Sequence, residues 1–152
     1  MPIQEIADQT RSHHQTQEAL CTRLEAIADG LPHHVDRQEC LLLARDILPA
    51  VKKAHQFEEN KLFPHLKQKV SVPGLSAGLE RLQFEHWEDE AYAEEISEVL
   101  LTIGRSETIA DAEQISWMLR GFFDGVRRHI AFEAEHLLPL LSNKQRTAKA
   151  VV

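Results

Sequence analysis

The sequence predicts an all-α protein folded as an antiparallel up-down four-helix bundle. Apolar residues recur at three- and four-residue steps along nearly the whole chain, and no stretch shows the strict alternation of a strand. Turn residues at 30–32, 71–74 and 104–106 divide the chain into four stretches. The resulting helices are expected at about 3–30, 35–69, 75–103 and 109–141. Because long helices joined by short loops pack antiparallel, we expect a single domain over residues 1–152.

Local signals refine these helices in chain order. The first ends at Gly30, which is followed by a leucine and a proline. The second contains Pro49 and Pro64, where we expect a kink or a local break because proline lacks a backbone donor. The fourth begins near Thr108, which forms a capping-box pattern with Asp111. We expect about eight residues at the end of the chain to fray.

Composition and charge exclude several classes of function. The net charge is −7 and the 17 basic residues are scattered, which argues against nucleic acid or an anionic membrane as a partner. No apolar run approaches the roughly 18 residues that a membrane span needs. The N-terminus lacks the pattern of a signal peptide, so we expect a cytoplasmic location. Cys21 and Cys40 fit no zinc or redox spacing and are expected to be buried thiols.

Histidine is unusually frequent, and most of the excess falls inside the apolar stripes. Each of the four stripes has a gap that holds a histidine with an acid four residues later: His14/Glu18, His55/Glu59, His86/Glu90 and His129/Glu133. Residues at this spacing lie on one face of a helix, so each pair is expected to point at the bundle axis. Burying carboxylates without compensation costs several kcal/mol each. A metal centre supplies that compensation, because cations offset the carboxylates and bind neutral imidazole.

Two ligand positions stay open at the level of the sequence. On the first helix, the phase of the neighbouring leucines favours His13, whereas the acid four residues later favours His14. On the second helix, the spacing from His55 favours Glu59, whereas the distance to the Leu-Phe-Pro ending and the heptad phase favour Glu58. Both members of each pair are therefore candidate ligands.

The remaining histidines and the aromatic residues carry less weight. We expect His33 and His34 at the surface beside a proline, and we give little weight to His65 and His136 as ligands. Four aromatic residues near the His/Glu pairs are interpreted as core packing, with a dry pocket around the metal as the alternative: Phe84, Trp87, Phe122 and Phe132.

These motifs resemble those of the hemerythrin-like domain family, the bacterial HHE cation-binding group, from about Ser12 to Leu141. The fourth helix carries the strongest match, His129-Ile-Ala-Phe-Glu133-Ala-Glu-His-Leu-Leu-Pro139. The second helix carries His55-Gln-Phe-Glu58-Glu59-Asn-Lys-Leu-Phe-Pro64, and the third has Glu85-His86 near its start. Found together and in this order, the motifs are specific.

The resemblance implies a hemerythrin-like bundle with a bridged pair of non-haem irons. The implied ligands are one histidine of the first helix, His55 and a glutamate of the second, His86, and His129 with Glu133. The small ligands that it implies are O2, NO or peroxide. Oxygen-carrying members have a second histidine where this chain has Glu90. A carboxylate there favours Fe(III), and hence oxidation or sensing over reversible carriage. Glu18 and Glu90 are candidates for further ligands or for partners of the histidines.

The sequence therefore favours a diiron protein that binds or senses O2, NO or redox state, or buffers iron, over an enzyme. A diiron oxidase or peroxide-consuming enzyme is the first alternative, although the ferritin-like oxidases place Glu before His in their motifs. A metal-free helical interaction module is the second. Zinc or manganese would also suit mixed nitrogen and oxygen donors. We expect no attached signalling domain, so the output partner of a sensor would be a separate molecule that the sequence does not identify.

Overall fold

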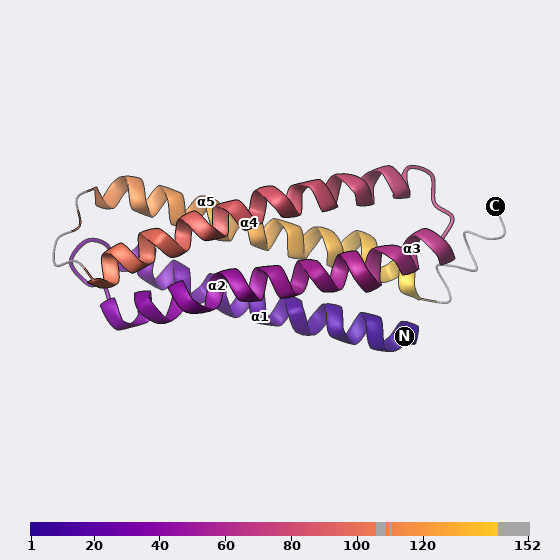
Figure 1. Cartoon of the computed structure of the whole chain (residues 1–152), viewed down its shortest axis with the longest axis horizontal. Coiled ribbons are helices and arrows are strands. Elements are labelled where there is room, and N and C mark those ends of the chain that lie inside the picture. Colours follow the sequence, from indigo (N-terminus) through magenta and orange to yellow (C-terminus); the bar gives the residue numbers. More distant parts are fainter. Residues whose placement is uncertain (106–108, 110, 143–152) are drawn as a thin grey trace.

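The computed structural model describes residues 1–105, 109 and 111–142. Its long helical segments run side by side along one axis (Figure 1). They are α1 (Ile3–Gly30), α2 (Arg37–Phe57) continued by a π-helical turn (Glu58–Leu62) and α3 (Phe63–Lys69), α4 (Leu75–Arg105), and α5 (Ala112–Phe132) continued by a π-helical turn (Glu133–Leu137) and a 3-10 turn (Leu138–Leu141). No strand occurs in the described part of the chain. The expected all-α four-helix bundle is confirmed.

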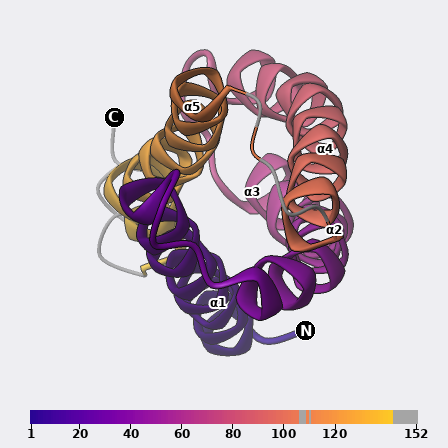
Figure 2. The ribbon, with the colours of Figure 1, turned by 90° about the vertical axis from the view of Figure 1, so that its left-hand side faces the viewer.

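Viewed from one end, the four long segments form a ring (Figure 2). α2 packs against α4 and α1, and α5 packs against α1. α4 and α5 make fewer contacts with each other than either makes with its other neighbour. The bundle is therefore least tightly closed between α4 and α5. None of the described helices is long and apolar enough to cross a membrane.

Helix starts follow side-chain capping. The carboxylate of Asp36 accepts a hydrogen bond from the backbone N–H of Glu39 at 3.0 Å and begins α2. Asp111 caps α5 in the same way, accepting from the backbone N–H of Gln114 at 3.0 Å. The fourth helix thus begins at Ala112, three residues later than expected. Thr108 and the chain end, where a capping box and fraying were expected, lie outside the described residues.

The prolines act differently from one another. α2 runs through Pro49 without a break, contrary to one of the two expectations for that position. At Pro64 the regular helix does change, because a π-helical turn ends at Leu62 and α3 begins at Phe63. A proline at this point removes a backbone donor and crowds the preceding turn, and the wider π turn accommodates both effects.

A layer of buried polar side chains divides the apolar core in two. The larger cluster is built around residues such as Leu24, Leu43 and Leu100, and the smaller one around Leu62 and Leu79. Between them lie six buried polar residues: His14, Gln17, His55, Glu58, His86 and Glu133. Cys21 and Cys40 are buried in the larger cluster, as expected. Because desolvation of a carboxylate is costly, the polar layer calls for a specific explanation.

Candidate metal centre

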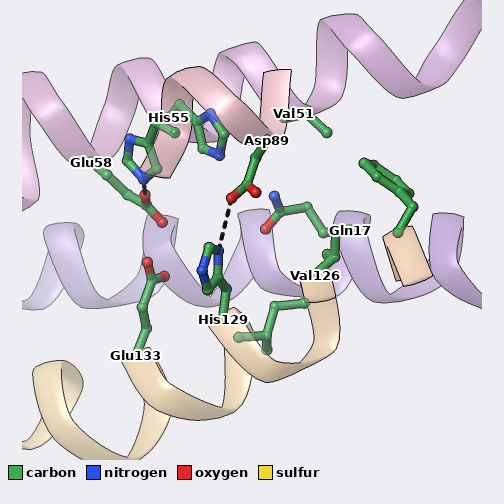
Figure 3. A pocket seen from close by; sticks show the side chains of 11 residues that line it. Gln17, Val51, His55, Glu58, Asp89, Val126, His129 and Glu133 are labelled. Carbon is green, nitrogen blue, oxygen red and sulfur yellow. Dashed lines mark ion pairs between the residues drawn. The ribbon is translucent and has the colours of Figure 1, made fainter. Parts of the chain in front are cut away.

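Two glutamates open the two π-helical turns and lie deep in the bundle. Glu58 is 6% exposed and Glu133 is 4% exposed. Each is followed six residues later by a proline, Pro64 and Pro139. A π turn advances the chain by an extra residue and is often found at functional sites. The matched turns bring the two carboxylates face to face across the bundle (Figure 3).

Histidines from the facing helices contact these carboxylates. His14 Nε2 lies 2.7 Å from Glu133 Oε1 and donates a hydrogen bond to it. His86 Nε2 lies 2.7 Å from Glu58 Oε2. Ligand atoms of His14, Glu58 and Glu133 all lie within 4.8 Å of one another, a spacing that one metal ion could span. The partners come from four different helical segments, so only the folded bundle assembles them.

Some polar atoms of this group lack a hydrogen bond. Neither Glu58 Oε2 nor His86 Nδ1 finds a partner with hydrogen-bond geometry among the described residues, although both atoms are buried. The carboxylate of Glu59 is 3.6 Å from His86 Nδ1, which is too far for a hydrogen bond. An unsatisfied buried polar group costs about 1–3 kcal/mol. Oxygen and nitrogen donors left open in a buried layer fit a bound cation.

The two carboxyl groups have opposite electrostatic environments. Burial, together with the charge of Glu133, raises the pKa of Glu58 well above its usual value. Burial also opposes ionisation of Glu133, but the hydrogen bonds from His14 and Glu58 outweigh it and lower the pKa of Glu133. In the metal-free protein the pair therefore holds a proton on Glu58 and a charge on Glu133. A cation would replace that proton.

His55 and His86 form a stacked pair in the same layer. Their ring centroids are 3.8 Å apart and their planes differ by 7°. Burial and the neighbouring His55 lower the pKa of His86 to about 3, so His86 is neutral and able to bind a metal. His55 Nδ1 lies 2.9 Å from Glu90 Oε2 and donates to it, which leaves Nε2 as the ring nitrogen that could bind a metal.

His129 lies at the edge of the layer and contacts two acids of α4. Its Nδ1 is 3.1 Å from Asp89 Oδ2 and its Nε2 is 3.2 Å from Glu85 Oε2. The hydrogen bond to Asp89 raises the pKa of His129, with burial opposing. The side chain is 34% exposed, more than those of the other histidines in the group.

A small cavity lies beside these residues. Its volume is about 20 Å³, room for about one water-sized molecule. Its lining includes the polar side chains of Gln17, Asp89 and His129 and the apolar side chains of Val51, Phe122, Val126 and Ile130. Figure 3 shows Gln17 beside Val51 and Val126. His129 also lines a surface groove of about 480 Å³ between α4 and α5, with Leu82, Phe132 and Arg128. His129 therefore stands between the interior cavity and the surface.

Comparison with known proteins agrees with this centre. The family model of the hemerythrin HHE cation-binding domain matches residues 5–141. The chain belongs to this family. Domains of the family bind metal cations, typically iron, and the His/Glu group found here is a candidate site for them. No match was found among curated proteins or among solved structures.

Within the hemerythrin HHE domain, most of the expected site residues come together. His14, His55, Glu58, His86 and Glu133 lie in the buried layer, and His129 borders the cavity. The alternatives at the two open positions lie outside the layer. His13 packs against the ring of Phe57 at a centroid distance of 5.2 Å. Glu59 is partly exposed and Glu58 takes the buried position.

The expected layout of one inward-facing His/Glu pair on each helix is wrong for α1. The side chain of Glu18 is 48% exposed and its Oε1 lies 2.9 Å from Arg127 Nε, so it points away from the axis. Glu90 reaches the layer only through His55. The close His/Glu contacts form between helices instead, because packing against the neighbouring helix selects the rotamer of each side chain.

The aromatic residues depart most from expectation. Core packing is wrong for three of the four, since Phe84, Trp87 and Phe132 are exposed. Phe122 is buried in the larger core cluster, which confirms core packing for that residue, and it also lines the cavity. His33 and His34 are exposed, as expected.

Two cavity residues, Asp89 and Gln17, were missed at the level of the sequence. Each lies three residues after a candidate histidine, Asp89 after His86 and Gln17 after His14. Spacings of three and four both place side chains on one helix face, and only the spacing of four was considered for these helices. A search at both spacings would have found them.

Proposed function

We propose that this hemerythrin HHE domain holds two irons and uses them to bind or sense a small ligand such as O2 or NO, or to respond to redox state. The observation that carries the proposal is the buried pair Glu58 and Glu133, which face each other with histidines on either side. Carboxylates can bridge two cations, and neutral imidazoles complete mixed nitrogen and oxygen coordination.

The residues that would hold the metals are those of the buried layer. His14 comes from α1, His55 from α2, His86 from α4 and His129 from α5, and the two glutamates open the π-helical turns that follow α2 and α5. When bound, an iron pair supplies an open coordination position and a change of oxidation state. The chain itself supplies imidazoles, two buried carboxylates and apolar side chains along part of the cavity wall.

The size and lining of the cavity support a small ligand. A volume of about 20 Å³ admits a molecule of two or three atoms at most. Val51, Phe122 and Val126 make part of its wall apolar, and Gln17 offers an amide beside them. The cavity is too small for a bulky organic substrate and suits a ligand of two or three atoms. Peroxide stays within the size limit.

The partner of His55 favours sensing over reversible oxygen carriage. A carboxylate that accepts from the outer nitrogen of a ligating imidazole makes that ligand more basic. Glu90 is such a carboxylate, at 2.9 Å from His55 Nδ1. More basic ligands stabilise Fe(III). Repeated cycling of the reduced protein with O2 should therefore end in oxidised iron, and a stable adduct over many cycles would contradict this.

Metal analysis tests the proposal directly. Protein is purified from iron-replete cells, or reconstituted anaerobically with Fe(II), and its metals are measured by mass spectrometry. We expect about two irons per chain, and charge-transfer absorption of the oxidised pair after exposure to O2. Less than about a tenth of an equivalent of metal would overturn the proposal, as would stoichiometric zinc in its place.

A further inference from the structure

α4 contributes to the centre in a way that the histidine pattern does not predict. His86 lies in the buried layer, and the acid expected beside it was Glu90, one turn later. Glu90 does not line the cavity. The side chain of Glu90 is 27% exposed. Its Oε2 lies 2.9 Å from His55 Nδ1, the ring nitrogen that would point away from the metal. Glu90 is thus not the side chain of α4 that joins His86 in lining the cavity.

Asp89, rather than Glu90, is the acid of α4 that lines the cavity. It follows His86 by three residues and lines the same cavity as His86, Glu58 and Glu133. Its Oδ2 lies 3.1 Å from His129 Nδ1, and the two side chains face each other across the cavity wall (Figure 3). Two donors bound to one metal at about 2.1 Å and at right angles are about 3.0 Å apart. In the metal-free protein a hydrogen bond joins Asp89 and His129, and the spacing of the two atoms also suits neighbouring ligands on one ion.

A separate observation shows that this region demands a cation. Glu58 Oε2 is buried and points into the cavity, and it has no hydrogen-bond partner in the described part of the chain. His86 Nε2 is only 2.7 Å from that oxygen, yet the contact lacks hydrogen-bond geometry. Two ligand-type atoms held this close in a buried layer suit a shared metal ion.

We propose that Asp89 is a metal ligand of the centre and that Glu90 is a positioning residue for His55. This inference rests on the proposed metal-binding function and assigns one of its ligands. With Asp89 the cavity holds three carboxylates, those of Asp89, Glu58 and Glu133, beside neutral imidazoles. Such a donor set prefers hard, highly charged cations, so the centre should favour Fe(III) over Fe(II) and manganese over zinc.

Matched amide variants test the assignment. Asp89→Asn and Glu90→Gln each remove one charge at adjacent positions while keeping shape. After anaerobic loading with Fe(II) and desalting, we expect wild type and Glu90→Gln to keep about two irons, and Asp89→Asn to keep about one. In chelator competition the weaker iron of Asp89→Asn should lose more than about 100-fold in affinity, against about 10-fold or less for Glu90→Gln. Circular dichroism checks that each variant is folded.

A second readout separates a ligand from a merely structural residue. With Co(II) in place of iron, loss of a ligand changes the visible ligand-field bands, whereas loss of an outer partner leaves their pattern. Asp89→Glu keeps a carboxylate and should restore the second metal. The assignment is overturned if Asp89→Asn keeps both irons as tightly as Glu90→Gln, or if its Co(II) spectrum equals that of wild type. Wild-type protein without metal overturns the proposed function and this assignment together.

Discussion

The segments that begin at Glu58 and at Glu133 share one local pattern and differ in their electrostatics. Each glutamate opens a π-helical turn, is nearly fully buried, and precedes a proline by six residues. The pKa of Glu58 is nevertheless raised, by burial first, while that of Glu133 is lowered because its hydrogen bonds from His14 and Glu58 outweigh burial. The same local structure thus acquires different chemistry from the helix that faces it.

The histidines that precede the two glutamates differ as well. His55 lies three residues before Glu58, and His129 lies four residues before Glu133. One residue rotates a side chain by about 100° around a helix. His55 is accordingly buried and stacked on His86, whereas His129 lies between the cavity and the surface groove. One end of the centre is therefore closed and the other is accessible.

Metal binding should remove the electrostatic difference between the two glutamates, because both would bind the cations. The largest effect we expect is therefore the loss of iron when either glutamate is substituted. Glu58→Gln and Glu133→Gln should each lower the iron content from about two to less than about 0.5 per chain, because a neutral amide replaces a carboxylate between the cations. Iron is measured by mass spectrometry after anaerobic loading. Glu135→Gln, on the exposed side of the same turn, is the control. Full iron content in either buried variant would contradict the shared role.

Without metal the same two variants should move stability in opposite directions. Glu133→Gln should lower the free energy of unfolding by about 1–3 kcal/mol, because it removes the charged acceptor of His14. Glu58→Gln should raise it by about 1 kcal/mol near neutral pH, because the amide is neutral without the proton uptake that burial imposes on Glu58. Urea unfolding in the presence of a chelator measures both. Equal effects of the two substitutions would show that the electrostatic difference is absent in solution.

The pH dependence of metal-free stability follows from the same two groups. A carboxyl whose pKa is raised by folding gives stability at low pH that is lost as pH rises through the folded pKa, which describes Glu58. A carboxyl whose pKa is lowered gives stability that is lost as pH falls, which describes Glu133. Glu58→Gln should flatten the alkaline loss of stability, and Glu133→Gln the acid loss. Unfolding curves between about pH 4 and pH 9 test this.

At the accessible end of the centre, a substitution should weaken metal binding but leave the stability of the fold nearly unchanged. His129→Gln should reduce the iron content while the metal-free stability changes by about 1 kcal/mol or less, because the partly exposed ion pairs of His129 contribute little. His55→Gln, at the closed end, should cost more stability in the same assay. Thermal unfolding of both metal-free variants compares them, and an equal loss would remove the distinction between the ends.

The smallest effect is expected at Glu18, which shares the spacing of the other pairs without their burial. Glu18→Gln should leave the iron content unchanged and alter stability by about 0.5 kcal/mol or less, since it loses only a surface ion pair with Arg127. Iron analysis and urea unfolding together check it. Loss of iron would restore Glu18 to the site.

Much of the fold could be predicted because its signals are local. Gly30 ends α1 and the loop after Lys69 separates α3 from α4, as turn chemistry requires. The effect of Pro49 could not be predicted, because whether a proline breaks a helix depends on the packing of its neighbours. The exposure of Trp87 and Phe84 could not be predicted either, because an aromatic residue at the edge of an apolar stripe can face the core or the solvent.

By itself, the sequence determined the four helices, the polar gaps in their apolar stripes and the family-specific His/Glu motifs. Only the tertiary structure buried His14 rather than His13 and Glu58 rather than Glu59, and brought Asp89 rather than Glu90 to the cavity. The physical reason lies in the helix period of 3.6 residues, which places neighbours at both three and four residues on one face. Which of them faces the axis is set by the π turns and by the helix that packs opposite.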